Sequence, residues 1–244
     1  MKKKLSIIIP TCDRYQFLKR LINFLNKENL FEIFVLDSSK KKIRDNKILK
    51  QKNVHYKYFS NSKTIHYKIS KICKYIKTKY VVICADDDFL IPEGLLSSLK
   101  FLEKNSDYAS AHGLYFAHPN FDEIRNGLNF NLFKLYRGGS AEENSPQDRV
   151  YNYLSGKNEY YPYYAVHRTS QFKSIWGNVY KYVFTNMGFG EILPCCLSLI
   201  QGKMKVIPVF YMSKESNNSW NFFSISKNKK IYSPRNFKFF SHER

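Results

Sequence analysis

Short apolar segments alternate with amphipathic ones along the first hundred residues, and this alternation limits the possible folds more than any other feature. Four segments are predicted as strands, three almost wholly apolar and one weakly alternating: residues 5–9, 33–36, 80–85 and 54–59. Residues 14–27 and 65–76 repeat apolar side chains at the helical period. Asp13 is the expected N-cap of the first of these helices, and Pro92 opens a third helix. Strands and helices in this order predict an α/β domain, a parallel sheet with helices on both faces.

Polar side chains follow the ends of these predicted strands. Thr11 and Asp13 come after the first strand, Asp37 ends the second, and Asp86, Asp87 and Asp88 follow the fourth. In such sheets the ligand binds at the carboxyl ends of the strands. Carboxylates gathered at one edge repel one another, so the pattern indicates a divalent cation and a polyhydroxylated ligand there.

Asp86, Asp87 and Asp88, here called the acidic triplet, are the most specific feature. They stand between a buried strand and the predicted helix that Pro92 opens, in a tight turn. Mg²⁺ or Mn²⁺ takes one or two carboxylates and leaves its other positions to phosphate oxygens and water. The alternative is a solvated acidic loop that caps the next helix. We favour a site, because the chain has few acids and three of them follow one core strand.

The second half of the chain is less regular. We expect strands at residues 107–116, 160–166 and 205–211, a hairpin or loop at 125–137, and helices at 146–154, 168–176 and 191–200. No repeat or linker is visible before about residue 212. The prediction is one domain, residues 1–212, followed by an extension, residues 213–244.

Glu191 follows two glycines, Gly188 and Gly190, at the predicted start of a helix. Glycines allow a close approach or an unusual turn. A carboxylate in the first turn fits a general base and equally fits a partner for the helix dipole. From the residues alone, we favour the helix-dipole interpretation.

The chain is strongly basic, with 40 Lys and Arg against 20 Asp and Glu and a net charge of +20. Residues 1–80 alone hold 21 basic and 5 acidic side chains. Such a region suits a nucleic acid, a nucleotide or an anionic membrane surface. A solvated lysine-rich face explains the same counts, and we give the two interpretations equal weight.

Several classes of protein lose support from missing motifs. The sequence has no G-x-G-x-x-G, G-x-x-x-x-G-K-[ST] or G-x-S-x-G stretch, and its six histidines lack zinc-site spacing. No apolar run approaches the ~18 residues of a membrane-spanning helix. The five cysteines form no C-x-x-C pair, so we expect a reduced, cytoplasmic protein without a signal peptide.

Three stretches together resemble the GT-A-fold glycosyltransferases of family two: residues 6–14, 35–39 and 81–88. The resemblance covers residues 5–100 well and continues more weakly to residue 208. It implies a GT-A-like single domain with a mostly parallel central sheet and helices on both faces. Residues 1–100 would then bind the nucleotide sugar and residues 101–212 the acceptor.

The same resemblance implies roles for the polar residues at the strand ends. Thr11, Asp13, Asp37 and Lys68 would hold the nucleoside, Asp86 the ribose, with Asp87 beside them in the nucleotide-sugar site, and Asp88 a Mn or Mg ion under the diphosphate. Residues 190–208 resemble the region that holds the family's catalytic base. This raises Glu191 above the helix-dipole interpretation, as the base that deprotonates the acceptor hydroxyl.

The implied reaction is an inverting transfer from a nucleotide-diphosphate sugar to a hydroxyl of a glycan or lipid-linked acceptor, expected in bacterial surface polysaccharide synthesis. No nucleic acid partner is expected. Two alternatives stay open: a Mg²⁺-dependent sugar-phosphate nucleotidyltransferase, and a non-catalytic basic protein that binds nucleic acid. Pyrophosphate release would identify the first, and steeply salt-dependent binding of nucleic acid the second.

The extension, residues 213–244, combines seven basic and seven aromatic residues. Basic charge with interfacial aromatic rings suits an anionic membrane surface. We therefore expect a peripheral contact with the inner face of the membrane. Packing of the extension onto the domain has equal weight.

Overall fold

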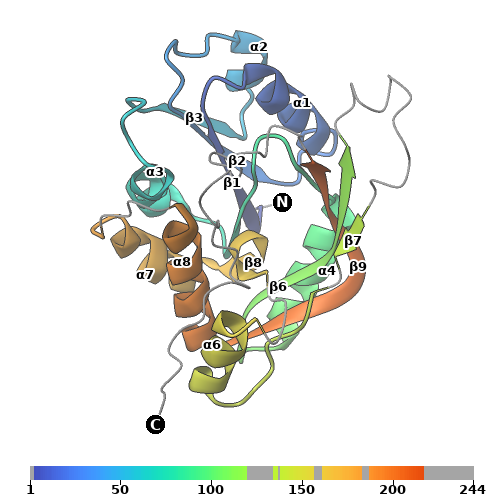
Figure 1. The fold of residues 1–244 in the computed structure, drawn as a ribbon. Helices are drawn as coiled ribbons and strands as arrows, with labels where there is room; N and C mark the ends of the chain where they lie inside the picture. The colour runs from blue at the N-terminus through green and yellow to red at the C-terminus, as the bar shows by residue number, and fades with distance from the viewer. Residues whose placement is uncertain (1–2, 120–133, 137, 157–160, 183–186, 217–244) are drawn as a thin grey trace.

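The structure is a computed structural model that describes residues 3–119, 134–136, 138–156, 161–182 and 187–216 (Figure 1). The first half contains β1 (Leu5–Thr11), α1 (Tyr15–Leu25), β2 (Glu32–Asp37), α2 (Asn46–Leu49), β3 (Val54–Tyr58), α3 (Ile65–Ile72), the 3₁₀ turn η1 (Cys73–Tyr75), β4 (Tyr80–Ile83), β5 (Phe89–Leu90) and α4 (Pro92–Lys104). The second half contains β6 (Tyr108–Pro119), β7 (Lys134–Tyr136), α6 (Pro146–Leu154), the 3₁₀ turn η3 (Pro162–Tyr164), β8 (Val166–Arg168), α7 (Thr169–Val179), α8 (Met187–Gln201) and β9 (Lys203–Ser216).

One mixed sheet connects all the described strands, in the order β3-β2-β1-β4-β8-β6-β9-β5, with β7 paired to β6. The first four strands run parallel, as predicted. The prediction of a mostly parallel sheet is wrong for the whole molecule, because β8 is antiparallel to both β4 and β6 and β5 is antiparallel to β9. A parallel neighbour needs a crossover that returns the chain to the same edge. Instead, β8 starts beside the carboxyl end of β4, directly after η3.

The strands of the first half are apolar throughout because both faces of the sheet are covered. Ile7 and Ile9 point into one core cluster, packed against α1 and α4, whereas Ile8 points into another, packed against α3 and α7. All three are fully buried. Alternate residues of one strand therefore serve two cores, which is why a continuous apolar run replaces the alternating pattern.

The N-cap of helix α1 lies one residue later in the chain than predicted. Asp13, expected as the N-cap, has a φ of 54° and lies outside the helix, whose N-cap is Arg14. The side chain of Arg14 makes no capping hydrogen bond. The Asp13 side chain is used instead by the neighbouring loop, as described below, so the N-cap prediction is wrong.

Within the described residues, two predicted elements of the second half differ in the structure. Residues 162–164 form the turn η3, and the strand begins only at Val166, so the strand predicted over residues 160–166 is wrong. Pro162 at the start of η3 has no N–H for a strand ladder. Helix α8 begins at Met187, which puts Glu191 in its second turn rather than its first. Of the expected hairpin, only β7 lies within the described residues.

Strand β9 continues to Ser216, past the expected domain boundary at residue 212. Ser213 pairs with both Phe89 of β5 and Phe116 of β6, so it belongs to the sheet. Residues 217–244 lie outside the described residues, and so does the predicted membrane contact of the extension. No helix in the described part of the chain has the length and apolar character needed to cross a membrane.

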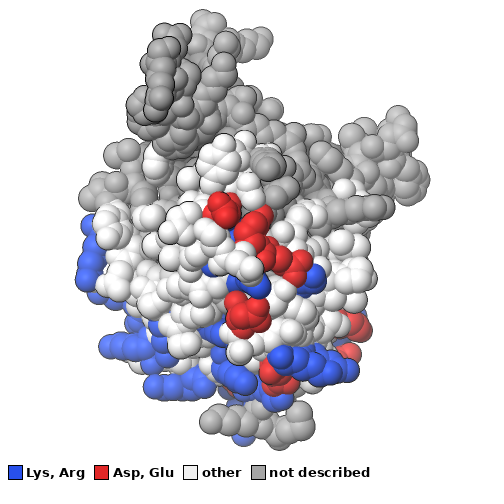
Figure 2. Space-filling model, turned by 90° about the horizontal axis from the view of Figure 1, so that it is seen from below, with Lys and Arg blue, Asp and Glu red and all other residues white. Residues whose placement is uncertain are grey.

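Charge is unevenly spread over the surface. Figure 2 shows acidic side chains gathered near the middle of one face, with lysines and arginines mostly along its lower and left margins. The excess of basic residues therefore does not cover this face evenly, and acidic groups are concentrated within it.

Candidate functional site

The carboxyl ends of β1, β2 and β4 bring together the polar residues predicted from their positions in the sequence. Thr11 pairs in register with Asp37 across β1 and β2. The Thr11 hydroxyl donates to Asp86 Oδ2 at 2.7 Å. Thr11, Asp37 and the whole acidic triplet are buried. The structure thus places these five residues at one edge of the sheet, as the parallel arrangement predicts.

Arg14 neutralises two members of the acidic triplet. Its guanidinium lies 3.0 Å from Asp86 Oδ1 and 2.5 Å from Asp87 Oδ2. Arg20 donates to the Asp87 carbonyl at 3.1 Å and pairs with Glu215 at 2.5 Å. The turn after β4 is therefore held from α1, the helix that follows β1.

Asp88 is held by the last strand of the sheet. Its Oδ1 accepts from the Glu215 amide at 3.2 Å, and its Oδ2 lies 3.6 Å from the Lys214 ammonium. Burial raises the pKa of Asp88 to about 6, an effect that Lys214 opposes. Burial also raises the pKa of Asp86 to about 6, against the influence of Arg14. Burial disfavours the charged form of both carboxyls, so a positive charge bound beside them would stabilise their ionised form.

The acidic triplet fits a divalent cation that is completed by a ligand. Its carboxylate oxygens are hard donors of the kind that Mg²⁺ and Mn²⁺ prefer. Within the described residues, no group of three or more His, Cys, Asp or Glu side chains forms a metal cage. The protein therefore offers one or two carboxylates, the number used where substrate phosphates and water supply the remaining ligands.

Asp37 shapes the loop after β2. Its Oδ1 accepts from the Ser39 amide at 2.8 Å, and its Oδ2 accepts from the Ile43 amide at 3.3 Å and the Tyr56 hydroxyl at 2.5 Å. The carboxylate is fully buried. These hydrogen bonds hold the loop that follows β2.

Asp13 joins the loops that follow β1 and β2. Its amide donates to Ser39 Oγ at 2.8 Å, and its Oδ1 accepts from the Lys40 amide at 2.9 Å. The positive φ of Asp13 turns the backbone sharply at this point. The side chain is exposed and lies at the carboxyl edge of the sheet.

Lys68 reaches the same edge from α3, beneath the loops. Its ammonium donates to Ser38 Oγ at 2.9 Å, to the Leu36 carbonyl at 3.2 Å and to the Thr11 carbonyl at 3.5 Å. The side chain is buried, and burial lowers its pKa. These three bonds occupy all three donors of an ammonium, so Lys68 ties the ends of β1 and β2 together in this structure.

Glu191, from the second half of the chain, shares the neighbour Lys214 with the acidic triplet. Its side chain is exposed to solvent, yet the protein around it raises the pKa of its carboxyl, and Lys214 opposes that rise. Lys214 also lies beside Asp88, and its ammonium is 4.6 Å from the centre of the Tyr164 ring. Lys214 therefore links the predicted base to the predicted metal ligand.

A tight contact between α3 and α8 fixes the position of Glu191. The His66 Nε2–H donates to the Gly190 carbonyl at 2.8 Å, and the imidazole stacks on Trp176 of α7 at 5.6 Å. A Cβ atom at Gly190 would lie 2.4 Å from His66 Cε1. Any other residue at position 190 would require the His66 ring to move, so packing favours glycine before Glu191.

Sequence reasoning predicted Lys68 but missed two other cations of the site, Arg14 and Lys214. Arg14 directly follows Asp13 in the first of the motif stretches, and that position was a signal for it. Lys214 lies just past the expected domain boundary, in a lysine-rich extension where nothing in the sequence distinguishes it from the other lysines. Its role follows only from the pairing of β9 with β5 and β6.

Solved structures of S. aureus TarS share the fold. TarS is 18% identical and matches with a TM-score of 0.57 over 91% of this chain and 38% of that chain. TarS 1–349 matches with a TM-score of 0.56, and TarS 1–349 in complex with UDP-GlcNAc with 0.59, both at 18% identity. These cover 91% and 87% of this chain but 62% and 58% of theirs. The chain thus spans about two fifths to three fifths of the structures it matches.

No curated protein matches the chain. The family model for glycosyl transferase family 2 matches residues 6–173, more than half of the chain. The match includes the ends of β1, β2 and β4 and the whole acidic triplet. The chain therefore belongs to glycosyltransferase family 2.

Proposed function

We propose that the protein is a metal-dependent, inverting glycosyltransferase that uses a nucleotide-diphosphate sugar. The acceptor is a hydroxyl of a glycan or lipid-linked molecule, in polysaccharide synthesis. The family and the likeness to TarS in complex with UDP-GlcNAc support a nucleotide-sugar donor. The observation that carries the proposal is the shared position of Lys214, beside the buried Asp88 and within electrostatic reach of Glu191.

The donor binds at the carboxyl ends of β1, β2 and β4. The loops that Asp13, Asp37 and Lys68 hold together receive the nucleoside, and Thr11 supports Asp86 beneath the ribose. Asp87 belongs to the same site through Arg14. Arg14 binds the phosphate oxygens of the diphosphate in addition to Asp86 and Asp87, because a guanidinium can form paired hydrogen bonds with a phosphate.

Asp88 holds the divalent cation, Mn²⁺ or Mg²⁺, on the side of the diphosphate. The bound cation supplies charge neutralisation for the leaving nucleoside diphosphate. Lys214 adds a second positive charge at the same place, because its ammonium already lies 3.6 Å from Asp88. The buried position of Asp88 strengthens both interactions, since charges act more strongly away from water.

Glu191 is the general base. Its carboxylate takes the proton of the acceptor hydroxyl as the oxygen attacks the anomeric carbon, and the bond to the diphosphate breaks on the opposite side. A raised pKa makes the carboxylate a stronger base near neutral pH. The exposure of its side chain leaves the acceptor a path to it.

The test is a transfer assay with UDP-GlcNAc as the first donor, read by release of UDP and by proton NMR of the product anomer. Wild-type protein is expected to turn over only with Mn²⁺ or Mg²⁺ and to invert the anomeric configuration. Asp88→Asn is expected to lose activity and metal-dependent donor binding. Asp107→Asn is the matched control, because Asp107 is exposed and pairs only with Lys203 on the surface.

Three results would contradict parts of the proposal. Release of pyrophosphate from a sugar phosphate and a nucleoside triphosphate would indicate a nucleotidyltransferase. Full activity of Asp88→Asn at limiting metal would reject Asp88 as the metal ligand. A product with retained configuration would reject the direct displacement.

A further inference from the structure

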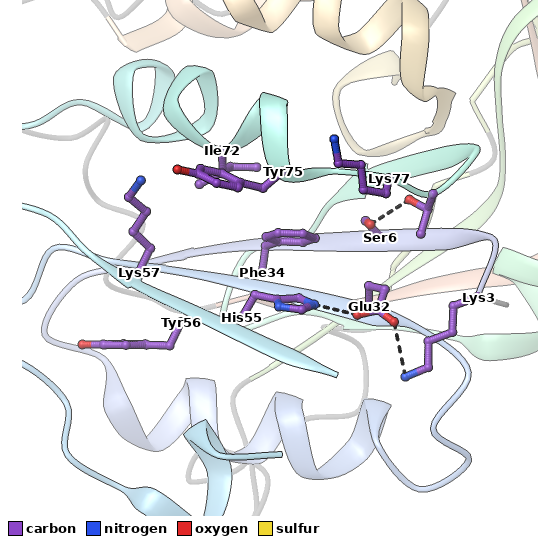
Figure 3. A pocket seen from close by; sticks show the side chains of 11 residues that line it. Lys3, Ser6, Glu32, Phe34, His55, Tyr56, Lys57, Ile72, Tyr75 and Lys77 are labelled. Atoms are coloured by element: carbon purple, nitrogen blue, oxygen red, sulfur yellow. Dashed lines mark hydrogen bonds and ion pairs between the residues drawn. The ribbon is translucent and has the colours of Figure 1, made fainter. Parts of the chain in front are cut away.

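A pocket lies at the edge of the sheet opposite to the acidic triplet, and we call it the amino-edge pocket (Figure 3). Its volume is about 570 Å³, within the usual range for small-molecule sites. It is lined from the starts of β1 and β2, from β3, from α3 and η1, and from the segment before β4. The proposed donor and acceptor sites use the other ends of these strands, and the lining residue Tyr56 reaches toward them through its hydrogen bond to Asp37.

Aromatic rings form two sides of the amino-edge pocket. Figure 3 shows Phe34 and His55 on the sheet side and Tyr75 on the η1 side. His55 stacks on Phe34 with 4.7 Å between ring centroids. Tyr75 is 51% exposed, so much of this large aromatic side chain is open to solvent. Rings on both sides favour a flat group between them.

The polar groups in the depth of the pocket are already paired. Ser6 Oγ lies 2.7 Å from Thr78 Oγ1, and the Thr78 hydroxyl donates to the Tyr80 carbonyl at 2.8 Å. Both side chains are buried. Specific recognition of a charged ligand therefore falls to the lysines at the ends of the pocket.

Two lysines bring positive charge that no carboxylate balances. Glu32 is the one carboxylate among the described lining residues, and it pairs with Lys3 at 3.8 Å and with His55 at 2.6 Å. Lys57 and Lys77 have no ion pair within the described part of the chain. Figure 3 shows them toward opposite ends of the pocket. The Lys57 ammonium lies 5.1 Å from the Tyr75 ring centre, within cation–π range.

We propose that the amino-edge pocket binds a second, small anionic ligand in which a planar ring carries a phosphate group. The ring lies between the Phe34–His55 stack and Tyr75, Lys57 binds the phosphate as a point charge, and Lys77 adds positive potential from the other end of the pocket. The nearby Lys74, 5.1 Å from the same Tyr75 ring, adds to the local positive potential. A ligand with a planar ring and a phosphate group matches both the aromatic side chains and the lysines that line the pocket, whereas a ring or an anion alone would match only one of them.

Isothermal titration calorimetry in EDTA tests this proposal with three probes: AMP, adenosine and inorganic phosphate. EDTA removes the metal that the donor site requires. AMP is expected to bind at least tenfold more tightly than either adenosine or phosphate. The double variant Lys57→Ala/Lys77→Ala is expected to weaken AMP binding at least tenfold, and Tyr75→Ala to weaken it about as much.

Lys100→Ala/Lys104→Ala is the matched control, because it removes two exposed lysines from α4, away from the pocket. It is expected to keep AMP affinity within twofold. Asp86→Asn/Asp88→Asn is expected to keep it too, since the acidic triplet lies at the other edge. Thermal melts of every variant report whether it is folded.

Four outcomes would overturn the proposal: no AMP binding at millimolar concentration, unchanged affinity in Lys57→Ala/Lys77→Ala, loss of binding in Asp86→Asn/Asp88→Asn, or phosphate binding as tight as AMP. The third outcome would place the ligand at the donor edge. The fourth would leave only an anion site.

Discussion

At the scale of single residues, the proposed chemistry depends on two carboxyls, Asp88 and Glu191, that share Lys214 as a neighbour. Asp88 is buried and Glu191 is exposed, yet the surrounding protein raises the pKa of both, and Lys214 opposes both shifts. A buried carboxyl suits a bound cation, and an accessible one suits an exchangeable acceptor. The two carboxyls thus suit different tasks within one site.

Glu191→Gln keeps the shape of the side chain and removes the proton acceptor. We expect kcat to fall by about 10²-fold or more, the usual range for loss of a general base. Donor affinity, measured by calorimetry, should stay within twofold, because Glu191 lies on the acceptor side. Glu103→Gln, an exposed change on α4, is the control. Loss of donor affinity together with kcat would indicate a structural role, and an unchanged kcat would reject the base.

Protons should compete with the metal at the acidic triplet. The pKa of Asp86 and that of Asp88 are raised to about 6, so both carboxyls become protonated as pH falls through that value. We expect the affinity for Mn²⁺ to be constant above about pH 7 and to fall at least tenfold between pH 6.5 and 5. Titration of free Mn²⁺ by electron paramagnetic resonance measures this. Affinity that is flat down to pH 5 would contradict the raised pKa values.

Residues that directly follow a buried strand could be predicted, because strand order in a parallel sheet fixes where their backbone lies. Thr11, Asp37 and the acidic triplet are at the predicted edge. Their partners could not be predicted, since Asp88 meets the Glu215 amide 127 positions along the chain. Pairings at that distance depend on the tertiary fold and leave no local pattern.

At the scale of elements, the contact of α8 with α3 and α7 decides where the base lies. Gly190 carries this contact, since its carbonyl accepts from His66 and its Cα has no room for a side chain. The strands of the first half were predictable because each apolar run has one explanation, a strand buried on both faces. Strand β8 could not be predicted, because a strand of three residues is too short to show a periodic pattern.

Gly190→Ala should push α8 away from α3. The new Cβ would lie 2.4 Å from His66, and such overpacking costs about 1–3 kcal/mol of unfolding free energy. We also expect kcat to fall, because Glu191 moves with the helix. Gly177→Ala in α7 is the control: its Cβ meets nothing within 4 Å, so it should stabilise by about 1 kcal/mol. Urea unfolding compares them. Rescue of Gly190→Ala by His66→Ala would identify the contact, and equal stability of the two glycine variants would exclude it.

At the scale of the whole molecule, the domain and the extension meet inside one strand. β9 ends at Ser216, so the site residues Lys214 and Glu215 belong to the sheet. The amino-acid composition alone predicted the domain boundary at residue 212. Basic residues lie both before and after Ser216, so composition does not mark the last described residue of β9. Only strand pairing separates the part that completes the sheet from the part that follows.

Removal of residues 217–244 tests the predicted membrane contact without touching the site. The shortened protein should keep its melting temperature and lose binding to vesicles that contain phosphatidylglycerol. Co-sedimentation with anionic and with neutral phosphatidylcholine vesicles measures the difference. Equal binding by the full and shortened chains would remove the contact from the extension. A large fall in melting temperature would favour packing onto the domain.

The hydrogen bond between Asp88 and the Glu215 amide also has a consequence for folding during translation. At about 5–20 residues per second, a ribosome adds the 127 positions between them in roughly 6–25 s. During that interval the nascent chain has β1, β2 and β4 but lacks Lys214 and the strand that carries it. The first half of the sheet can thus begin to fold early, while Asp88 gains its ammonium partner only after β9 has been synthesised.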